Sequence, residues 1–168
     1  MCCMARTEHH IKAHLRLIPV KACLYVVPPK AERQRIAKQF GKIRKQFAKF
    51  LAENHLEDLR RLGISEAEID IMRETGRGPE GYTVHHKLPR HGGGTNDFSN
   101  LVLISRAIHS DIHYEMDRQL FGSKKPISQM KTGDSCWIDI PTPEGMIYIP
   151  PVLPALDNIP DSLRLKLR

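Results

Sequence analysis

The chain has 168 residues, 40% of them hydrophobic, and a formal net charge of +7 with an isoelectric point near 9.4. This length fits one domain, or one domain with an appendage, and the basic charge indicates an anionic partner, of which nucleic acid is the first candidate. The four cysteines are scattered and form no Cys-x-x-Cys pair, which excludes a small disulfide scaffold and a cysteine-based zinc ribbon.

Residues 1–29 are predicted to form an N-terminal appendage that ends at Pro28 and Pro29, where the chain loses two backbone donors. The apolar run inside it, residues 15–27, is interrupted by two basic residues and a proline. It is therefore a poor secretory signal and is too short to cross a bilayer. We expect no membrane span, and synthesis in the cytoplasm.

A basic amphipathic helix is predicted for residues 30–62. Apolar residues recur there at three- and four-residue steps: Ile36, Phe40, Ile43, Phe47, Phe50, Leu51, Leu56, Leu59 and Leu62. The opposite face carries Lys30, Arg33, Arg35, Lys38, Lys42, Arg44, Lys45 and Lys49 against Glu32. Such one-sided charge suits a phosphate backbone, although a merely solvated helix face has the same pattern, and both interpretations stay open. Gly41 is expected to weaken or bend the helix.

Residues 63–122 are predicted to form the functional core. Ser65 and Glu68 have the spacing of a capping box at the start of a short helix. A strand is then predicted for residues 82–88, a glycine-containing loop for 89–98, a buried strand for 101–104 and a helix for 105–121.

The remaining residues, 123–168, are predicted to form a C-terminal β-hairpin and a tail. The strand candidates 136–140 and 146–149 flank a segment rich in turn residues, and the proline-rich end from residue 150 is expected to be ordered only in part. The whole chain is therefore expected to be α+β, with helices from 30 to 74 packed behind a small sheet and the hairpin adding an edge.

Four histidines of the predicted core form a candidate metal and proton-transfer site: His85, His86, His109 and His113. His109 and His113 are four residues apart on a predicted helix, so both imidazoles can reach one metal ion. Neighbouring residues of a strand point to opposite sides, so one histidine of the 85–86 pair can complete the site while the other acts as a base. Three imidazoles with an open position suit a catalytic metal.

The combined pattern resembles the HNH, or ββα-metal, endonucleases, in particular the nuclease modules of bacterial toxins such as colicin-like DNases and type VI secretion effectors. The matching pieces are residues 81–89, 93–104 and 109–113, within a stretch from about 62 to 121. The resemblance implies that His85, His109 and His113 bind one divalent ion, which is Mg, Zn, Ni or Mn. It also implies that His86 is the general base and that Asn100 fixes the loop and orients that base.

The same resemblance implies a metal-dependent, largely sequence-nonspecific endonuclease that hydrolyses double-stranded DNA. Such an enzyme would be an antibacterial toxin, delivered into a target bacterium by a secretion system and neutralised by an acidic immunity protein. The alternatives are a phage or restriction-type HNH endonuclease, an RNase, and a non-catalytic zinc-containing nucleic-acid-binding module. No sequence-reading element is recognised in the chain, which favours nonspecific cutting.

Cationic and glycine residues flank the histidines. The flanking side chains either hold phosphates of the substrate or are ordinary surface charge; they are Lys87, Arg90, His91 and Arg106. Arg90, at the mouth of the loop, is the strongest candidate for a phosphate contact. The three consecutive glycines, 92–94, either let the backbone approach a phosphate or only form a tight loop. The sequence leaves both alternatives open.

Overall fold

The structure, a computed structural model, describes residues 13–122 and 129–152. In chain order the elements are a 3-10 helix η1 (Ala13–Leu17), β1 (Val20–Val26), α1 (Lys30–Asn54), α2 (Leu56–Arg61), α3 (Glu66–Thr75), β2 (Tyr82–His86), the 3-10 helices η2 (Arg90–Gly92) and η3 (Phe98–Asn100), β3 (Leu101–Ser105), α4 (Arg106–Gly122) and β4 (Ser135–Pro141). The described residues thus contain both helices and small antiparallel sheets, which confirms the α+β class.

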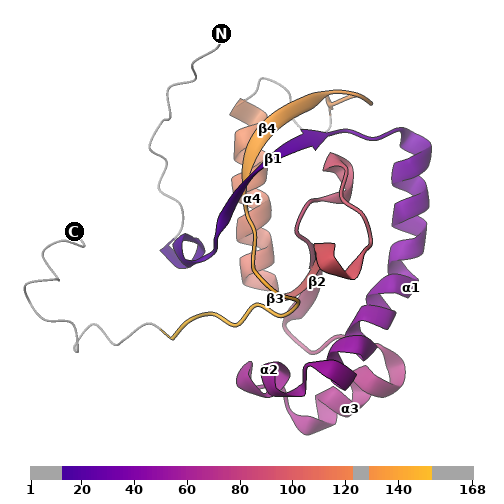
Figure 1. Cartoon of the computed structure of the whole chain (residues 1–168), viewed down its shortest axis with the longest axis vertical. Coiled ribbons are helices and arrows are strands. Elements are labelled where there is room, and N and C mark those ends of the chain that lie inside the picture. The colour runs from indigo at the N-terminus through magenta and orange to yellow at the C-terminus, as the bar shows by residue number, and fades with distance from the viewer. Residues whose placement is uncertain (1–12, 123–128, 153–168) are drawn as a thin grey trace, which may run out of the picture.

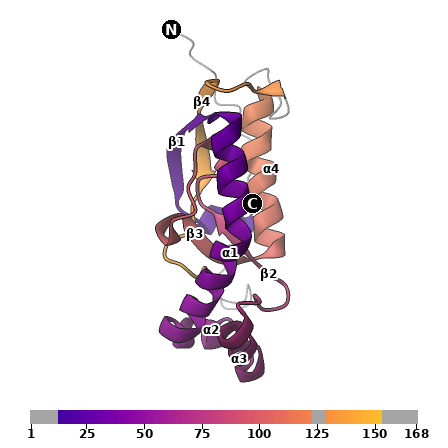
Figure 2. The same cartoon turned by 90° about the vertical axis from the view of Figure 1, so that its right-hand side faces the viewer.

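The molecule is elongated, and α2 and α3 form one end of it (Figures 1 and 2). Toward the other end, β1 and β4 pair with each other beside α4 (Figure 1). Within the described ranges, no helix combines the length and the apolar character needed to cross a membrane.

β3 lies between two hydrophobic cores. Val102 and Ile104 belong to one of them, the α4 core, together with side chains of β1, β4 and α4. Leu101 and Leu103 belong to the other, the α1 core, together with side chains of α1, α2 and α3. All four are fully buried, at 0% exposure, because successive residues of a strand face opposite sides and both sides of β3 are covered.

The helical region differs from the single helix that the periodicity predicts for residues 30–62. α1 passes through Gly41 and ends at Asn54, and His55 leaves the helical conformation before α2 begins. The break turns α2 back so that Leu59 is fully buried in the α1 core. A continuous helix would carry this leucine away from the core, so burial of its apolar surface outweighs helix continuity.

α3 begins as its sequence predicts. The Ser65 hydroxyl accepts a hydrogen bond from the Glu68 backbone, and the Glu68 carboxylate accepts one from the Ser65 backbone. The helix ends at Gly76, whose φ of 71° lies in the left-handed region that glycine adopts without strain. The predicted capping box is confirmed, and it fixes where the chain turns toward β2.

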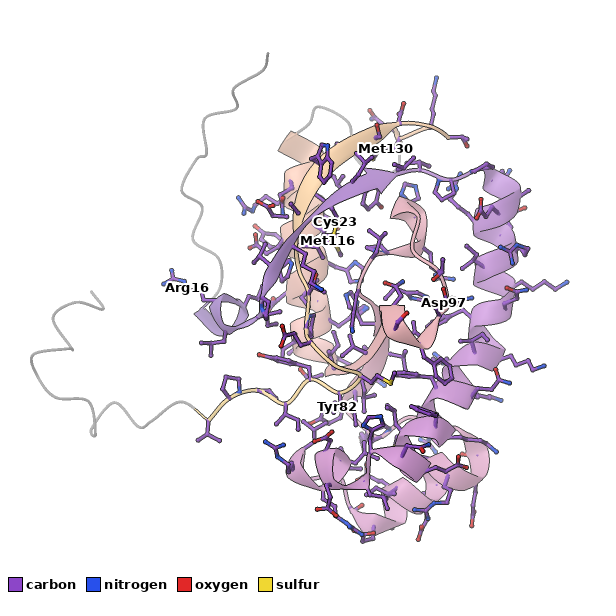
Figure 3. The ribbon with its side chains drawn as sticks, in the orientation of Figure 1. Arg16, Cys23, Tyr82, Asp97, Met116 and Met130 are labelled. Atoms are coloured by element: carbon purple, nitrogen blue, oxygen red, sulfur yellow. The ribbon has the colours of Figure 1, made fainter. Side chains whose placement is uncertain are left out.

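β1 is an integral strand of the fold. It pairs with β4 over its whole length, and Tyr25 is only 2% exposed. Cys23 packs against the α4 core, which includes Met116 of α4 (Figure 3). The prediction that residues 1–29 form an appendage is therefore wrong for the part that the structure describes, because this segment supplies apolar side chains to a core. Residues 1–12 lie outside the described residues.

The predicted C-terminal hairpin is also wrong. Its first strand is β4, which pairs with β1, while its second lies beside β3. There the Leu103 backbone N–H donates to the Met146 carbonyl (2.8 Å), and the Tyr148 N–H donates to the Leu103 carbonyl (3.0 Å). A local hairpin would leave the edges of β1 and β3 unpaired, so the two segments separate to cover both. Most of the predicted tail, residues 153–168, lies outside the described residues.

Candidate metal centre

Two adjacent histidines at the end of β2 face opposite sides of the strand. His85 lies opposite Val102 and His86 lies opposite Leu101 in the antiparallel register. Cross-strand neighbours share a face, so His85 turns toward α4 and His86 toward α1. The alternation of side chains along a strand predicts that His85 and His86 lie on opposite faces of β2. The chemical roles of these two side chains stay predictions.

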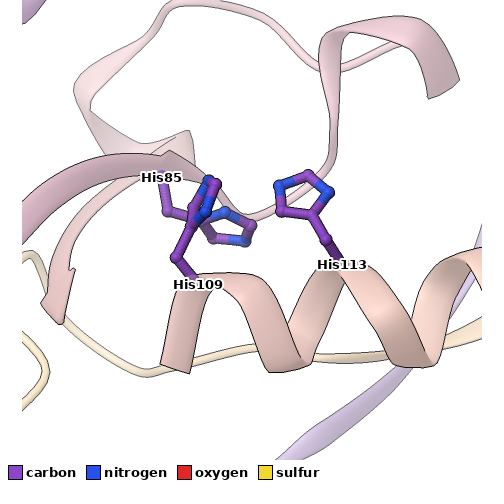
Figure 4. A group of neighbouring side chains, drawn as sticks. All are labelled: His85, His109 and His113. Atoms are coloured by element: carbon purple, nitrogen blue, oxygen red, sulfur yellow. The ribbon is translucent and has the colours of Figure 1, made fainter. Parts of the chain in front are cut away.

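His85, His109 and His113 form one cluster (Figure 4). His109 and His113 project from one face of α4 with ring centroids 4.4 Å apart. The ring of His85 lies 5.2 Å from that of His109 and 5.3 Å from that of His113, nearly perpendicular to both. One nitrogen from each of the three residues lies within 4.8 Å of the other two. Two separate elements thus bring three imidazole donors to one point.

His85 is the most deeply buried of the three, at 1% exposure. Among the residues that the structure describes, its two ring nitrogens are the buried side-chain polar atoms that have no hydrogen-bond partner. An unsatisfied buried polar group costs about 1–3 kcal/mol. A metal ion held by the cluster would satisfy one of these nitrogens, so the donor set fits a metal.

Burial keeps the cluster neutral. It lowers the pKa of His85 to about 2, and the neighbouring imidazoles of His113 and His109 add to the effect. Burial also lowers the pKa of His109 and the pKa of His113. Neutral imidazoles carry the lone pair that binds a metal, so these three side chains are ready to act as ligands at neutral pH.

His86 belongs to a separate chain of hydrogen bonds. The Asn96 side-chain nitrogen donates to the Ile36 carbonyl of α1 (2.9 Å), and its Oδ1 lies 2.9 Å from Nε2 of His86. Because Oδ1 can only accept, Nε2 of His86 carries the hydrogen and Nδ1 keeps a lone pair. The His86 ring also packs on Phe40 of α1, with centroids 4.4 Å apart. These contacts fix both the orientation and the tautomer of His86.

The surroundings of His86 also shift its protonation. Burial lowers the pKa of His86, and the hydrogen bond with Asn96 works in the opposite direction because it stabilises the charged ring. The net pKa lies below the ordinary value for histidine, so the ring is mostly neutral at pH 7 and can accept a proton.

Asn100 fixes the loop between β2 and β3. Its Oδ1 accepts from the Leu88 backbone N–H (2.9 Å), and its Nδ2 donates to the carbonyls of Leu88 (3.1 Å) and Thr95 (2.9 Å). These contacts match the loop-fixing role predicted for Asn100. The hydrogen bond that orients His86 comes from Asn96 instead, a residue that sequence analysis missed. Its partner on α1 lies 60 residues away in the sequence, and no local pattern signals such a contact.

The glycines of the loop are required for packing. A Cβ atom at Gly92 would overlap the ring of Tyr25, and one at Gly94 would overlap the Leu88 carbonyl. Gly93 has a φ of 99°, in the left-handed region. Of the two interpretations that the sequence leaves open, the structure supports the tight loop, which seats η2 against β1.

A pocket of about 510 Å³ brings the histidines together with cationic side chains. It is lined by Arg33, Phe40, Thr83, Val84, His85, His86, Pro89, Arg90, His91, His109 and His113. The Arg90 guanidinium lies 5.1 Å from the centroid of the Phe40 ring, and Nδ1 of His91 is hydrogen-bonded to the Tyr25 hydroxyl (2.9 Å). Of the four phosphate-binding candidates from the sequence, Arg90 and His91 therefore line the pocket, and Lys87 and Arg106 do not.

Fold and site together define an α+β protein with a candidate three-histidine metal centre. The chain is similar to YhhZ, an uncharacterized protein of Escherichia coli K12, with 32% identity over 129 residues. The match covers 74% of this chain and 31% of YhhZ, so the chain spans about a third of that protein. No protein-family model matches the chain. No solved structure matches it either.

Proposed function

We propose that the chain is a metal-dependent endonuclease with a ββα-metal (HNH) core that cuts double-stranded DNA without strong sequence preference. In this proposal, β2 and β3 are the two strands of the core and α4 is its helix. The observation that carries the proposal is the presence of an oriented fourth histidine, His86, beside a set of three histidine ligands. A purely structural metal site requires ligands but does not require an oriented base beside them.

His85, His109 and His113 are the proposed ligands of one divalent ion, which is Mg, Zn, Ni or Mn. When bound, the ion supplies positive charge that stabilises the negative charge developing on the phosphate during hydrolysis. Imidazole ligands favour Zn, Ni or Mn by affinity, whereas Mg suits oxygen ligands.

His86 is the proposed general base. Its Nδ1 lone pair accepts a proton from the attacking water while the water oxygen bonds to phosphorus and the bond to the leaving oxygen breaks. The hydrogen bond from Nε2 to Asn96 holds the ring in the required tautomer and stabilises the charged ring that forms. A positioned base of this kind contributes about 10²–10⁴-fold to the rate.

Arg33 and Arg90 are the proposed partners of the substrate phosphates at this pocket. Both line the same pocket as the histidines, and the net charge of the chain is +7. Contacts to phosphates do not recognise the base sequence directly, which supports cutting without sequence preference.

We also propose that the enzyme is an antibacterial toxin, delivered into the cytoplasm of a target bacterium and neutralised by an acidic immunity protein. The resemblance of the motif to toxin nuclease modules supports this role. The net charge of +7 and the two arginines that line the pocket, Arg33 and Arg90, support an acidic partner.

The nuclease proposal is tested by incubating the purified protein with supercoiled plasmid in EDTA and then adding single divalent metals back. We expect no cleavage in EDTA and conversion to open-circular and linear DNA with at least one metal. Plasmid that stays supercoiled with every metal, over a wide range of protein concentration, would contradict the proposal. Matched DNA and RNA substrates separate a DNase from an RNase.

A further inference from the structure

A second cleft, of about 710 Å³, lies beside the metal pocket. Its walls are α1, the end of α3 with the segment that follows it, and the starts of β2 and α4. Tyr82 is the first residue of β2 (Figure 3). Four cationic side chains line it: Arg44, Lys45, Arg77 and Arg106. Glu80 is the one acidic residue in this lining, so the cleft is strongly positive.

The cleft continues the metal pocket along α1. Thr83 and Val84 of β2 line both. α1 also contributes to both, with Phe40 on the metal pocket and Arg44 on the cleft. These two residues are four apart and therefore lie on the same face of the helix. One ligand can contact both hollows along this face.

The length of this track suits a polynucleotide. Arg33 at the metal pocket and Arg44 at the cleft are 11 positions apart on α1. At 1.5 Å per residue this corresponds to roughly 17 Å. One strand of duplex DNA advances about 3.4 Å of axis per phosphate, so the track spans roughly five phosphates.

The four cations of the cleft face one acidic residue, Glu80, and form no ion pair with it. In residues 13–122 and 129–152, none of the side chains of Arg44, Lys45, Arg77 and Arg106 makes an ion pair or a hydrogen bond. Four arginines outside the cleft form ion pairs: Arg60 with Glu57 and Glu66, Arg61 with Asp58, Arg73 with Asp70, and Arg118 with Glu115. Four cations gathered in a hollow with a single acidic residue, and without ion pairs, are the arrangement expected for binding a polyanion.

The wall that carries Arg77 is fixed in place. Gly76 approaches α1 so closely that a Cβ atom would overlap the backbone of Lys45. The Lys49 ammonium donates to the Glu74 carbonyl (2.8 Å), and the Glu80 backbone N–H donates to the Glu68 carboxylate (3.2 Å). The segment is therefore held on both sides of Arg77, and the cleft is formed without a ligand.

We infer that this cleft binds the sugar-phosphate backbone of the nucleic-acid strand next to the bond that is cut, through Arg44, Lys45, Arg77 and Arg106. The inference rests on the proposed function, because it takes the metal pocket as the position of the scissile phosphate. It identifies the substrate as a polynucleotide that extends several phosphates to one side of that bond.

The test compares two double variants that lose the same charge. Arg77→Gln/Arg106→Gln removes two cations of the cleft, and Lys38→Gln/Lys42→Gln removes two exposed cations of α1 that line neither hollow. Binding of a short fluorescent DNA duplex is measured by anisotropy in EDTA at several salt concentrations. All four residues are exposed, so thermal unfolding of both variants should match that of the wild type.

We expect Arg77→Gln/Arg106→Gln to weaken duplex binding by about tenfold or more and to reduce the slope of log affinity against log salt by about 2, because two phosphate contacts are lost. The control should lose no more than about twofold. Arg44→Gln, on the opposite wall, should change binding in the same direction as the cleft variant. Equal losses in the cleft and control variants would overturn the inference, because net charge alone would then explain them.

The outcome also separates this inference from the nuclease proposal. If the cleft variant loses duplex binding and the wild type does not cleave plasmid, the inference about the cleft stands and the nuclease proposal is contradicted. If the wild type cleaves plasmid and the cleft variant binds the duplex as the wild type does, the nuclease proposal stands and the inference about the cleft is contradicted.

Discussion

His85 and His86 are adjacent in the chain but have different surroundings. His85 faces α4 and has two buried nitrogens without a hydrogen-bond partner, whereas His86 is hydrogen-bonded to Asn96. The proposed division between ligand and base therefore depends on a contact made by Asn96, which also reaches the Ile36 carbonyl of α1. This contact gives α1 a direct influence on the proposed base.

The role of Asn96 can be tested through the pH dependence of cleavage. The neutral ring is the active form of a base, and burial holds the pKa of His86 below its ordinary value. The rate should therefore fall only at a pH below the ordinary pKa of histidine. Asn96→Ala removes a hydrogen bond that raises this pKa. In the pH–rate profile of Asn96→Ala, we expect the fall in rate on the acidic side to move to lower pH. The cleavage rate of this variant at pH 7 should also fall about tenfold, because the tautomer of His86 is no longer fixed.

Thr95→Ala is the matched control for this experiment, since the Thr95 hydroxyl bonds to Asp97 and not to His86. Its pH profile should match that of the wild type. An Asn96→Ala profile that superimposes on the wild-type profile would show that the amide does not act on the base.

At the scale of elements, the loop between β2 and β3 depends on glycines that pack closely. Gly92→Ala would place a methyl group against the buried ring of Tyr25 and should destabilise the protein by about 1–3 kcal/mol. Gly41→Ala, in the exposed middle of α1 with open space around it, should stabilise by about 0.5–1 kcal/mol. Urea unfolding of both variants measures the difference. Equal effects of the two alanines would contradict this account of the loop.

Local sequence patterns predict where the helices and strands lie, but they do not predict which strands pair with each other. The capping box at Ser65 and the strands and helix around the histidines follow from short-range spacing. The pairing of β1 with β4 does not, because strand propensity at residues 136–140 gives no information about which distant edge needs a partner. The break at His55 is not predicted either, because the apolar periodicity continues through it. The burial of Leu59 that the break allows depends on packing between elements, which periodicity does not report.

At the scale of the whole molecule, the candidate site joins the two cores. α4 presents His109 and His113 from one side, and α1 presents Phe40 from the other. β2 connects them through its two histidines. The site is therefore complete only when both cores are folded, so the proposed metal binding should be linked to global stability.

Metal removal tests this link. Metal at about 100 times its Kd should stabilise the protein by about 2.7 kcal/mol, and EDTA should remove this increment. His113→Ala should lose most of the metal-dependent rise in Tm, because it removes one proposed ligand of the cluster. His55→Ala, a histidine between α1 and α2 and outside the cluster, should keep that rise. Equal metal-dependent shifts in the two variants would remove His113 from the ligand set.

We propose that His86 is the base of a metal-dependent nuclease and not one of its metal ligands. The most direct test is the rate of plasmid cleavage by His86→Ala at saturating metal, with metal affinity measured on the same sample by calorimetry. We expect cleavage to slow by at least about 100-fold while metal affinity stays within about twofold of the wild type. Cleavage at the wild-type rate, or loss of metal binding together with activity, would contradict the claim.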